Sequence, residues 1–390
     1  MTDIASFVTQ GQDAVFPPEE LDARLDAARH ELSERGIDVY LVTGPENIFY
    51  LTGQQTPGYY TFQALLLPAE GEPWFIVREL EHANLVANSW LENIEHYRDN
   101  ADPVDVVSTL LEKLGWSNKR IAIDKRGWFL PIALYEALAS ALGAVADAAG
   151  VVEKLRRVKS PLEIEKIARA AHYTDIGLQA GMAAVREGAS DNDLVAAMMY
   201  ASVAAGGEYV GMEPLCSVGN RTGVPHGTWR RGKLGANAPA FLEMSSCHDR
   251  YHASLMRCAW VGQPPDEARR MMDVCLEGLD AALAKLKPGN TCADVHNACQ
   301  SVIDKAGYTD AFKKRVGYSV GISFAPDWGE GHILSLFTGV DVVLETGMSF
   351  HIVPALRRYG EFTVCVSETV TVTDDGHRVM GTFPRDMHVV

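Results

Sequence analysis

The sequence predicts an α+β protein of two domains, a smaller α/β domain followed by a larger domain that contains a repeated unit. At 390 residues the chain exceeds the usual size of a single hydrophobic core. Short apolar runs alternate with helical stretches in the first part, as in α/β domains. In the second part, a helix pair followed by a strand-rich stretch occurs twice, which indicates a duplicated α+β domain.

The first domain begins with a helix over 18–35, which has acidic residues in its first turn and Gly36 at its end. The elements that follow alternate in type, and this alternation predicts a mixed sheet. The expected strands are 39–44, 64–68, 73–77 and 120–124, and the expected helices are 80–91, 103–114 and 130–141.

A domain boundary is expected near 152–165. Ser160 and Pro161, with Glu163 after them, form a helix start that follows a basic connector. We therefore expect domains over 1–155 and 156–390. In the second domain the expected helices are 161–187, 190–206, 265–287 and 291–306, with strand-rich stretches up to 262 and over 315–372.

Composition excludes some functions. A net charge of −16 and a pI near 5.2 argue against binding to nucleic acid or to an anionic membrane. No apolar run approaches the roughly 18 residues that span a bilayer. The start, MTDIASFVTQ, has no signal-peptide pattern, and the seven cysteines lack CxxC spacing. Reduced thiols and a cytoplasmic location are expected.

Six motifs in the second half occur in a fixed order: VKSPLEIEKIARAA, SVGNRTGVPHGTW, FLEMSSCHDRYHASLMRC, GYSVGI, ETGMSFHIVP and VSETVTVTDDG. Together they resemble the pita-bread superfamily of creatinase, prolidase and methionine aminopeptidase. The resemblance implies a C-terminal pita-bread domain, a creatinase-like N-terminal domain and a homodimer.

The positions where that superfamily holds two metal ions carry other residues here, namely Glu243, Ser254, Tyr318, Val353 and Ser367. Serine, tyrosine and valine do not replace the Asp, His and Glu ligands of such hydrolases. The comparison therefore predicts a chain that needs no metal and no other cofactor.

Within the superfamily, GYSVGISFAPDWGEG, the PHGTW loop and NIFYLTG are similar to the ectoine hydrolases, a metal-free branch. The segment ALRRYGEFTVCVSE departs from them, with Arg357, Arg358 and Cys365. The resemblance implies hydrolysis of a C–N bond in a zwitterionic cyclic amidine. The expected reaction is ring opening of ectoine or 5-hydroxyectoine to N-acetyl-2,4-diaminobutyrate.

Three residues are expected to carry the chemistry. Glu243 stands at the first ligand position and is the predicted carboxylate nucleophile. His226, in the loop that resembles a substrate-binding segment, is the predicted general acid and base, because an imidazole titrates near neutral pH. Tyr318 is expected to donate a hydrogen bond to the intermediate.

The expected substrate-binding residues supply acidic groups, an indole face and a cation. Acidic side chains beside a tryptophan suit a cationic ring. An arginine of the first domain is expected to reach the substrate carboxylate across a dimer interface. The residues are Asp327, Trp328, Glu330, Glu368, Tyr59 and Arg78.

Three other functions compete with this prediction. The chain could be an Xaa-Pro dipeptidase or aminopeptidase with unusual metal ligands, which metal analysis would reveal. It could be a creatinase-like amidinohydrolase with another substrate. It could also be a binding module without catalysis, although retention of Glu243 and His226 argues against that.

Overall fold

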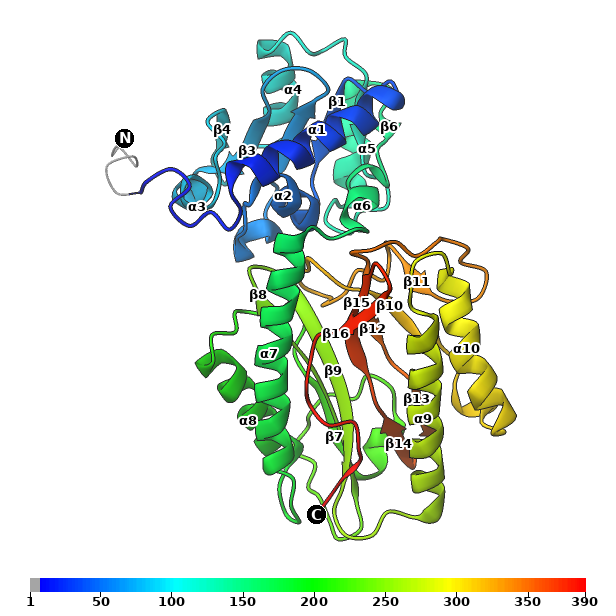
Figure 1. Ribbon diagram of the computed structural model, residues 1–390. Coiled ribbons are helices and arrows are strands. Elements are labelled where there is room, and N and C mark those ends of the chain that lie inside the picture. The colour runs from blue at the N-terminus through cyan, green and yellow to red at the C-terminus, as the bar shows by residue number, and fades with distance from the viewer. Residues whose placement is uncertain (1–7) are drawn as a thin grey trace. The chain divides into compact units, whose positions relative to one another are not determined.

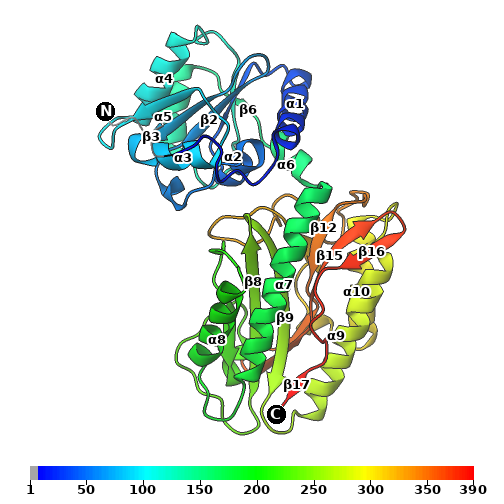
Figure 2. The same cartoon turned by 60° about the vertical axis from the view of Figure 1, so that its left-hand side comes forward.

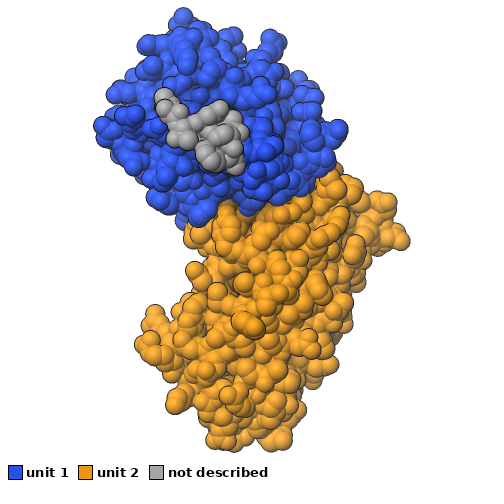
Figure 3. All heavy atoms as spheres, turned by 90° about the vertical axis from the view of Figure 1, so that its left-hand side faces the viewer, with its two compact units in different colours: residues 1–156 blue, residues 157–390 orange. Residues whose placement is uncertain are grey.

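The computed structural model describes residues 8–390, which form two compact units separated between Arg156 and Arg157 (Figure 3). The boundary expected from the sequence lies one residue earlier. Residues 1–7 belong to the start in which no signal peptide was predicted, and they lie outside the described residues.

The first unit has a six-stranded mixed sheet in the order β4-β3-β2-β1-β5-β6 (Figure 1). Strands β1, β2 and β3 pair antiparallel, and the other neighbours pair parallel. The strands are β1 (Val39–Val42), β2 (Ala64–Pro68), β3 (Trp74–Arg78), β4 (Ile94–Tyr97), β5 (Ile121–Ile123) and β6 (Ala146–Asp147). The helices are α1 (Pro18–Glu34), α2 (Pro45–Thr52), α3 (His82–Asn88), α4 (Pro103–Lys113), α5 (Ile132–Leu142) and α6 (Val151–Arg156), with short 3-10 turns η2 (Pro57–Tyr60) and η3 (Glu79–Glu81).

The apolar pattern of the chain accounts for this sheet. All four residues of β1 are buried, as expected of a central strand with both faces covered. Helix α4 is capped by Asp102, whose carboxylate accepts a 2.8 Å hydrogen bond from the Val104 amide, and Leu110 and Leu111 of the helix pack into the core. The segment expected to be a basic connector includes a helix, α6.

The second unit contains two helix pairs at opposite sides with the strands between them (Figures 1 and 2). The sheets have the orders β17-β9-β8-β7 and β11-β10-β12-β15-β16, and β13 pairs with β14. The helices are α7 (Pro161–Ala183), α8 (Asp191–Ala204), α9 (Asp266–Lys285) and α10 (Cys292–Lys305), with 3-10 turns η4 (Gly219–Gly223) and η5 (Thr309–Ala311). The strands are β7 (Leu215–Val218), β8 (Pro239–His248), β9 (Tyr251–Trp260), β10 (Gly317–Ser319), β11 (Ser335–Leu336), β12 (Ser349–Ile352), β13 (Ala355–Arg358), β14 (Phe362–Cys365), β15 (Glu368–Thr373), β16 (Gly376–Val379) and β17 (His388–Val389).

The two halves of this unit repeat one local design. Helices α8 and α10 both have 14 residues, and both begin with a capping box, formed by Ser190 with Asp193 and by Thr291 with Asp294. Each cap residue also forms an isolated antiparallel bridge, ahead of β8 in one half and ahead of β12 in the other. The duplication predicted from the sequence is present in the fold.

Strand alternation in β8 divides its side chains between two cores. Leu242 and Met244 pack with residues of α7 and α8. Phe241 faces the opposite way, into the core shared with α9, α10 and the later strands. Because side chains alternate along a strand, Glu243 faces the same side as Phe241, toward the region between the two halves.

Two further expectations can be compared with the structure. All seven cysteines are unpaired and buried, as predicted. In residues 8–390, no helix combines the length and apolar character needed to cross a membrane.

Candidate active site

Glu243 lies in the middle of β8, where it pairs in register with Leu215 of β7 and Met256 of β9. Only 9% of the residue is exposed. Its carboxylate has no hydrogen-bond or ion-pair partner among residues 8–390. Burial raises its pKa to about 7, and the opposing positive charges of Lys314 and Arg357 limit the shift. A buried carboxylate without a partner is costly, which marks it as a functional group.

Of the cations that lower the pKa of Glu243, Lys314 has the largest effect. A role for this residue was not predicted from the sequence. Lys314 lies between η5 and β10, and burial lowers the pKa of its amine to about 8. Arg357 lowers this pKa further, whereas Glu243 raises it. The sequence offers only the run KKR at 313–315, which does not show that the second lysine faces inward.

His226 lies in the loop that joins β7 to β8, beyond η4. Its backbone has a φ of 55°, in the left-handed region, and the residue is exposed. Desolvation lowers the pKa of the imidazole, as do the charges of Arg357 and Lys314, whereas Asp327 raises it. Lys314 and Arg357 therefore lower the pKa of both His226 and Glu243. Because its pKa is lowered, the His226 ring is neutral at pH 7, as a proton acceptor must be.

Tyr318 belongs to a hydrogen-bonded chain that also includes Ser367, another of the residues expected from the sequence at a ligand position. Trp328 Nε1 donates to the Tyr318 hydroxyl at 3.0 Å, and this hydroxyl lies 2.9 Å from His351 Nδ1. His351 Nε2 lies 2.7 Å from Ser367 Oγ, which accepts from the Met256 amide at 2.7 Å. Burial, with Lys314 next in effect, lowers the pKa of His351 well below its usual value. The imidazole is therefore a neutral link between Tyr318 and Ser367.

Asp327 and Trp328 lie next to Tyr318, but Glu330 faces elsewhere. Asp327 Oδ1 accepts from the amides of Trp328 at 2.7 Å and of Gly329 at 3.1 Å, and the indole is only 2% exposed. The Glu330 carboxylate pairs with Lys159 at 2.8 Å. Its role as a substrate contact stays a prediction, with Lys159 already bound to it.

Glu368 also has cationic partners of its own. Arg257 and Arg385 each lie 3.0 Å from its Oε1. Burial raises the pKa of Glu368, and the two arginines oppose this shift. Arg257, only 1% exposed, further binds the Ser367 carbonyl oxygen, so the pair fixes the start of β15. A role for Glu368 in substrate binding stays a prediction.

Tyr59 and Arg78 belong to the first unit. The Tyr59 ring packs edge-on against Phe129, with 5.5 Å between the ring centroids. Arg78 forms ion pairs with Glu81 at 3.3 Å and Asp99 at 3.5 Å. Their expected contribution to the substrate site remains a prediction.

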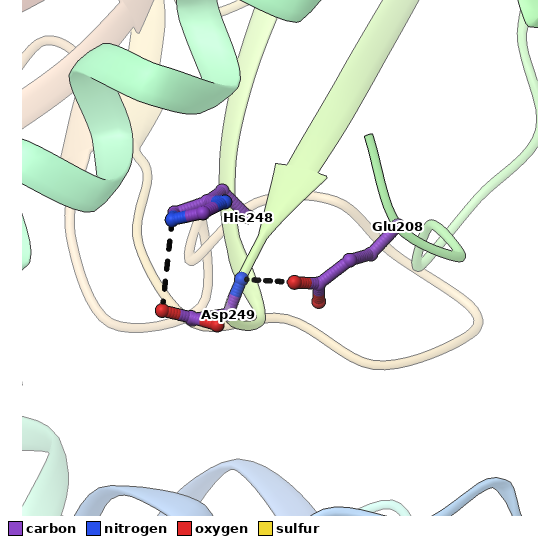
Figure 4. A group of neighbouring side chains, drawn as sticks. All are labelled: Glu208, His248 and Asp249. Atoms are coloured by element: carbon purple, nitrogen blue, oxygen red, sulfur yellow. Dashed lines mark hydrogen bonds and ion pairs between the residues drawn. The ribbon is translucent and has the colours of Figure 1, made fainter. Parts of the chain in front are cut away.

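The side chains around Glu243 do not fit a two-metal centre. The other four ligand positions offer two hydroxyls, a phenol and an alkyl group, and Tyr318 and Ser367 are tied to His351. In the part of the chain that the structure describes, only Glu208, His248 and Asp249 bring three candidate ligand atoms together (Figure 4). This group lies at the β8–β9 turn, and Lys166 already binds Asp249 there at 2.6 Å.

Comparison with known proteins establishes the family. Residues 24–158 match the creatinase/prolidase N-terminal domain, and residues 165–374, more than half of the chain, match metallopeptidase family M24. The chain belongs to family M24. Ectoine hydrolase from Halomonas elongata is 32% identical to this M24 protein over 96% of this chain and 98% of its own length. An Xaa-Pro dipeptidase from Lactobacillus helveticus is 25% identical over 94% and 98%.

Solved structures of a dipeptidase and a prolidase share the fold of this chain. Dipeptidase PepE from Mycobacterium ulcerans superposes with a TM-score of 0.83 at 24% identity, covering 96% of this chain and 99% of that one. Prolidase from Thermococcus sibiricus gives a TM-score of 0.86 at 21% identity, covering 95% and 99%. The predicted α+β class, with a creatinase-like first domain and a pita-bread second domain, is confirmed.

Proposed function

We propose that this M24 hydrolase opens the ring of a cyclic amidine without a metal ion, with ectoine or 5-hydroxyectoine as substrate. The observation that carries the proposal is the unpartnered carboxylate of Glu243, buried at a position where family members hold metal. A cationic amidinium is the ligand that such a carboxylate attracts. The likeness to an ectoine hydrolase over nearly the whole chain supports the choice of substrate.

The reaction begins when a Glu243 oxygen bonds to the amidinium carbon and the C=N electron pair moves to nitrogen. One ring nitrogen then takes a proton from solvent water and its bond to this carbon breaks, which leaves an imidate on Glu243 and a free amine. Of the two protons that the attacking water later loses, one returns to solvent and the other makes this amine an ammonium. His226 removes a proton from water, which attacks the same carbon and releases the Glu243 carboxylate. One water is consumed in total, and its oxygen becomes the amide oxygen of N-acetyl-2,4-diaminobutyrate.

The protonation states of the two groups suit these roles at neutral pH. Glu243, with a pKa of about 7, is substantially ionised and remains a stronger base than an exposed carboxylate. His226, whose pKa is lowered, is available as a base for water. Tyr318 lies in the electrostatic field of Glu243 and can donate its hydroxyl proton to the adduct.

The proposal is tested by incubating chelator-treated protein with ectoine and following the acetyl methyl signal by NMR. We expect ring opening at the rate of untreated protein, and no product with Glu243→Gln at an unchanged circular dichroism spectrum. Failure to convert ectoine and 5-hydroxyectoine would overturn the substrate assignment. Conversion by Glu243→Gln at near wild-type rate would overturn the nucleophile.

A second candidate is an Xaa-Pro dipeptidase, favoured by the M24 match and by relatives with that activity. It requires bound metal, which the donor set described above disfavours. Metal analysis of the purified protein separates the two functions. Two Mn, Co or Zn ions per subunit, with cleavage of an Xaa-Pro dipeptide, would replace our proposal with the peptidase.

A further inference from the structure

Two cations near Glu243 lack the acidic partners that their sequence neighbours have. Lys313 pairs with Asp310 at 3.4 Å, and Arg358 pairs with Glu267, both at the surface. Lys314 and Arg357 have no ion-pair partner among residues 8–390. The Nε of Arg357 is buried without a hydrogen-bond partner. Lys313 and Arg358, which are exposed and ion-paired, therefore serve as matched controls for Lys314 and Arg357.

Arg357 is held beside the loop that carries His226. It lies on β13 in register with Thr363 of β14. The Thr363 hydroxyl donates to the Thr222 carbonyl oxygen at 2.5 Å, and Thr222 belongs to η4 at the start of that loop. A Cβ on Gly223 would lie 2.6 Å from the Arg358 carbonyl oxygen, so the hairpin and the turn are in direct contact.

A backbone contact between the segments next to Lys314 and Arg357 brings Lys314 close to the β13 hairpin. The Val353 amide donates to the Val316 carbonyl oxygen at 2.7 Å, which joins the chain after Lys314 to the chain before β13. Arg357 lowers the pKa of Lys314, as a like charge does at short range. Neither cation lies within 4 Å of the Glu243 carboxylate, so this group leaves both unpaired.

Lys314 and Arg357 are half-buried, and two positive charges that repel each other there are stabilised by an anion between or beside them. Arginine and lysine side chains are the usual partners of a carboxylate, with arginine able to bind both of its oxygens. A role as metal ligands does not explain Lys314 and Arg357, because positively charged side chains do not bind metal ions. A substrate that carries its own carboxylate supplies the missing charge.

We propose that Lys314 and Arg357 bind the carboxylate of the substrate and restrict this M24 protein to amidines that carry one. The inference rests on the proposed function and adds the residues that select the substrate class. It assigns to the second unit a role that sequence comparison gave to Arg78, whose guanidinium has Glu81 and Asp99 as partners. In this arrangement Glu243 contacts the amidinium of the substrate, and Lys314 and Arg357 bind the carboxylate at the other end of the same molecule.

The test combines two ligands with two variants and their controls. The ligands are ectoine and the same methyl-tetrahydropyrimidine ring without its carboxylate. The variants are Lys314→Met and Arg357→Met, and the matched controls are Lys313→Met and Arg358→Met. Binding is measured by calorimetry, together with kcat and KM wherever product forms, and unfolding temperatures verify that each variant is folded.

For wild type and both controls, we expect removal of the carboxylate to weaken binding about 10- to 100-fold, the usual value of a charged hydrogen bond. In Arg357→Met this preference should fall to about 3-fold or less, because the carboxylate then has lost its partner. The loss should appear in KM and in the dissociation constant of ectoine more than in kcat. Arg357→Lys should recover part of the preference, which a purely structural role would not predict.

The outcomes separate this inference from the proposed function. An equal preference for the carboxylate in wild type and in both Met variants would overturn the carboxylate site, even if ectoine is hydrolysed. A preference that depends on Arg357 and Lys314, without turnover of either ring, would retain the carboxylate site and overturn the amidine hydrolase. If a Met variant fails to fold, Arg357→Gln and Lys314→Gln provide the same comparison.

Discussion

At neutral pH the Glu243 carboxyl group is close to half ionised, because burial raises its pKa to about 7 while Lys314 and Arg357 oppose the shift. An exposed glutamate at the same pH is fully ionised. Folding therefore favours the protonated form of this group. The free energy of unfolding is greatest at low pH, where Glu243 is protonated in both the folded and the unfolded protein. Part of this stability is lost as the pH rises through the pKa of Glu243 in the folded protein.

The Glu243→Gln variant removes this dependence. Between about pH 4.5 and pH 7 the wild type should lose about 3 kcal/mol of unfolding free energy relative to the variant, from a shift between the ordinary pKa of 4.5 and about 7. Chemical denaturation of both proteins at pH 5 and pH 8 measures the difference. Equal pH dependence in the two proteins would show that the Glu243 pKa is not raised.

Single residues show which parts of a candidate site a sequence can point to and which it cannot. Glu243 and His226 could be located because each stands at a fixed place in a motif. Lys314 could not, because two adjacent lysines look alike until the strands place one inside. Glu330 was expected to meet substrate because it stands beside a tryptophan, but the partner it binds, Lys159, is distant in sequence.

Strands β10 and β12 carry Tyr318 and His351 of the hydrogen-bonded chain, and its third member, Ser367, directly precedes β15. Tyr318 and His351 are direct cross-strand partners on β10 and β12. The ring of Tyr318 needs space, which Gly329 provides. A Cβ at Gly329 would lie 2.6 Å from Cε2 of Tyr318, closer than atoms in contact can approach.

We expect Gly329→Ala to displace the tyrosine ring, to lower kcat about 10-fold or more, and to destabilise the fold by about 1–3 kcal/mol. The matched control is Gly376→Ala in the same sheet, where a Cβ has nothing within 4 Å. Turnover of ectoine and thermal unfolding are the measurements. Identical activity of the two variants would show that the position of Tyr318 does not matter.

At the scale of elements, the sequence predicted long helices better than short ones. Periodic apolar residues and capping signals located α7, α8, α9 and α10, with ends within a few residues of the expected ones. Helix α2 was missed because seven of its eight residues are buried, so no polar face reveals its period. Strand β4 was missed because it is short and largely polar in sequence.

On the scale of the whole molecule, a buried ion pair ties the beginning of the second unit to its later sheet. Lys159 precedes α7, and its amine contacts Glu330 at 2.8 Å and the Ser319 hydroxyl at 3.1 Å. Both charged side chains are only 1% exposed. Loss of one partner removes a counter-charge from the other buried charge, which is strongly destabilising.

Lys159→Met and Glu330→Gln should each lower the unfolding free energy by about 3–5 kcal/mol, and the double variant should lose much less than their sum. The double variant should hydrolyse ectoine with an unchanged KM at a temperature where it is folded. Denaturant unfolding and steady-state kinetics provide both readouts. A higher KM in the folded double variant would support Glu330 as a substrate contact.

The two halves of the second unit are alike in architecture but contribute different groups around Glu243. The earlier half supplies the carboxylate of Glu243 on β8, whereas Lys314 and Arg357 come from the later half. A duplicated fold alone would accept a ligand in either of two directions related by its internal symmetry. Under the proposed binding mode, Glu243 and the two cations would admit a zwitterion in one direction, and this direction would decide which bond meets Glu243.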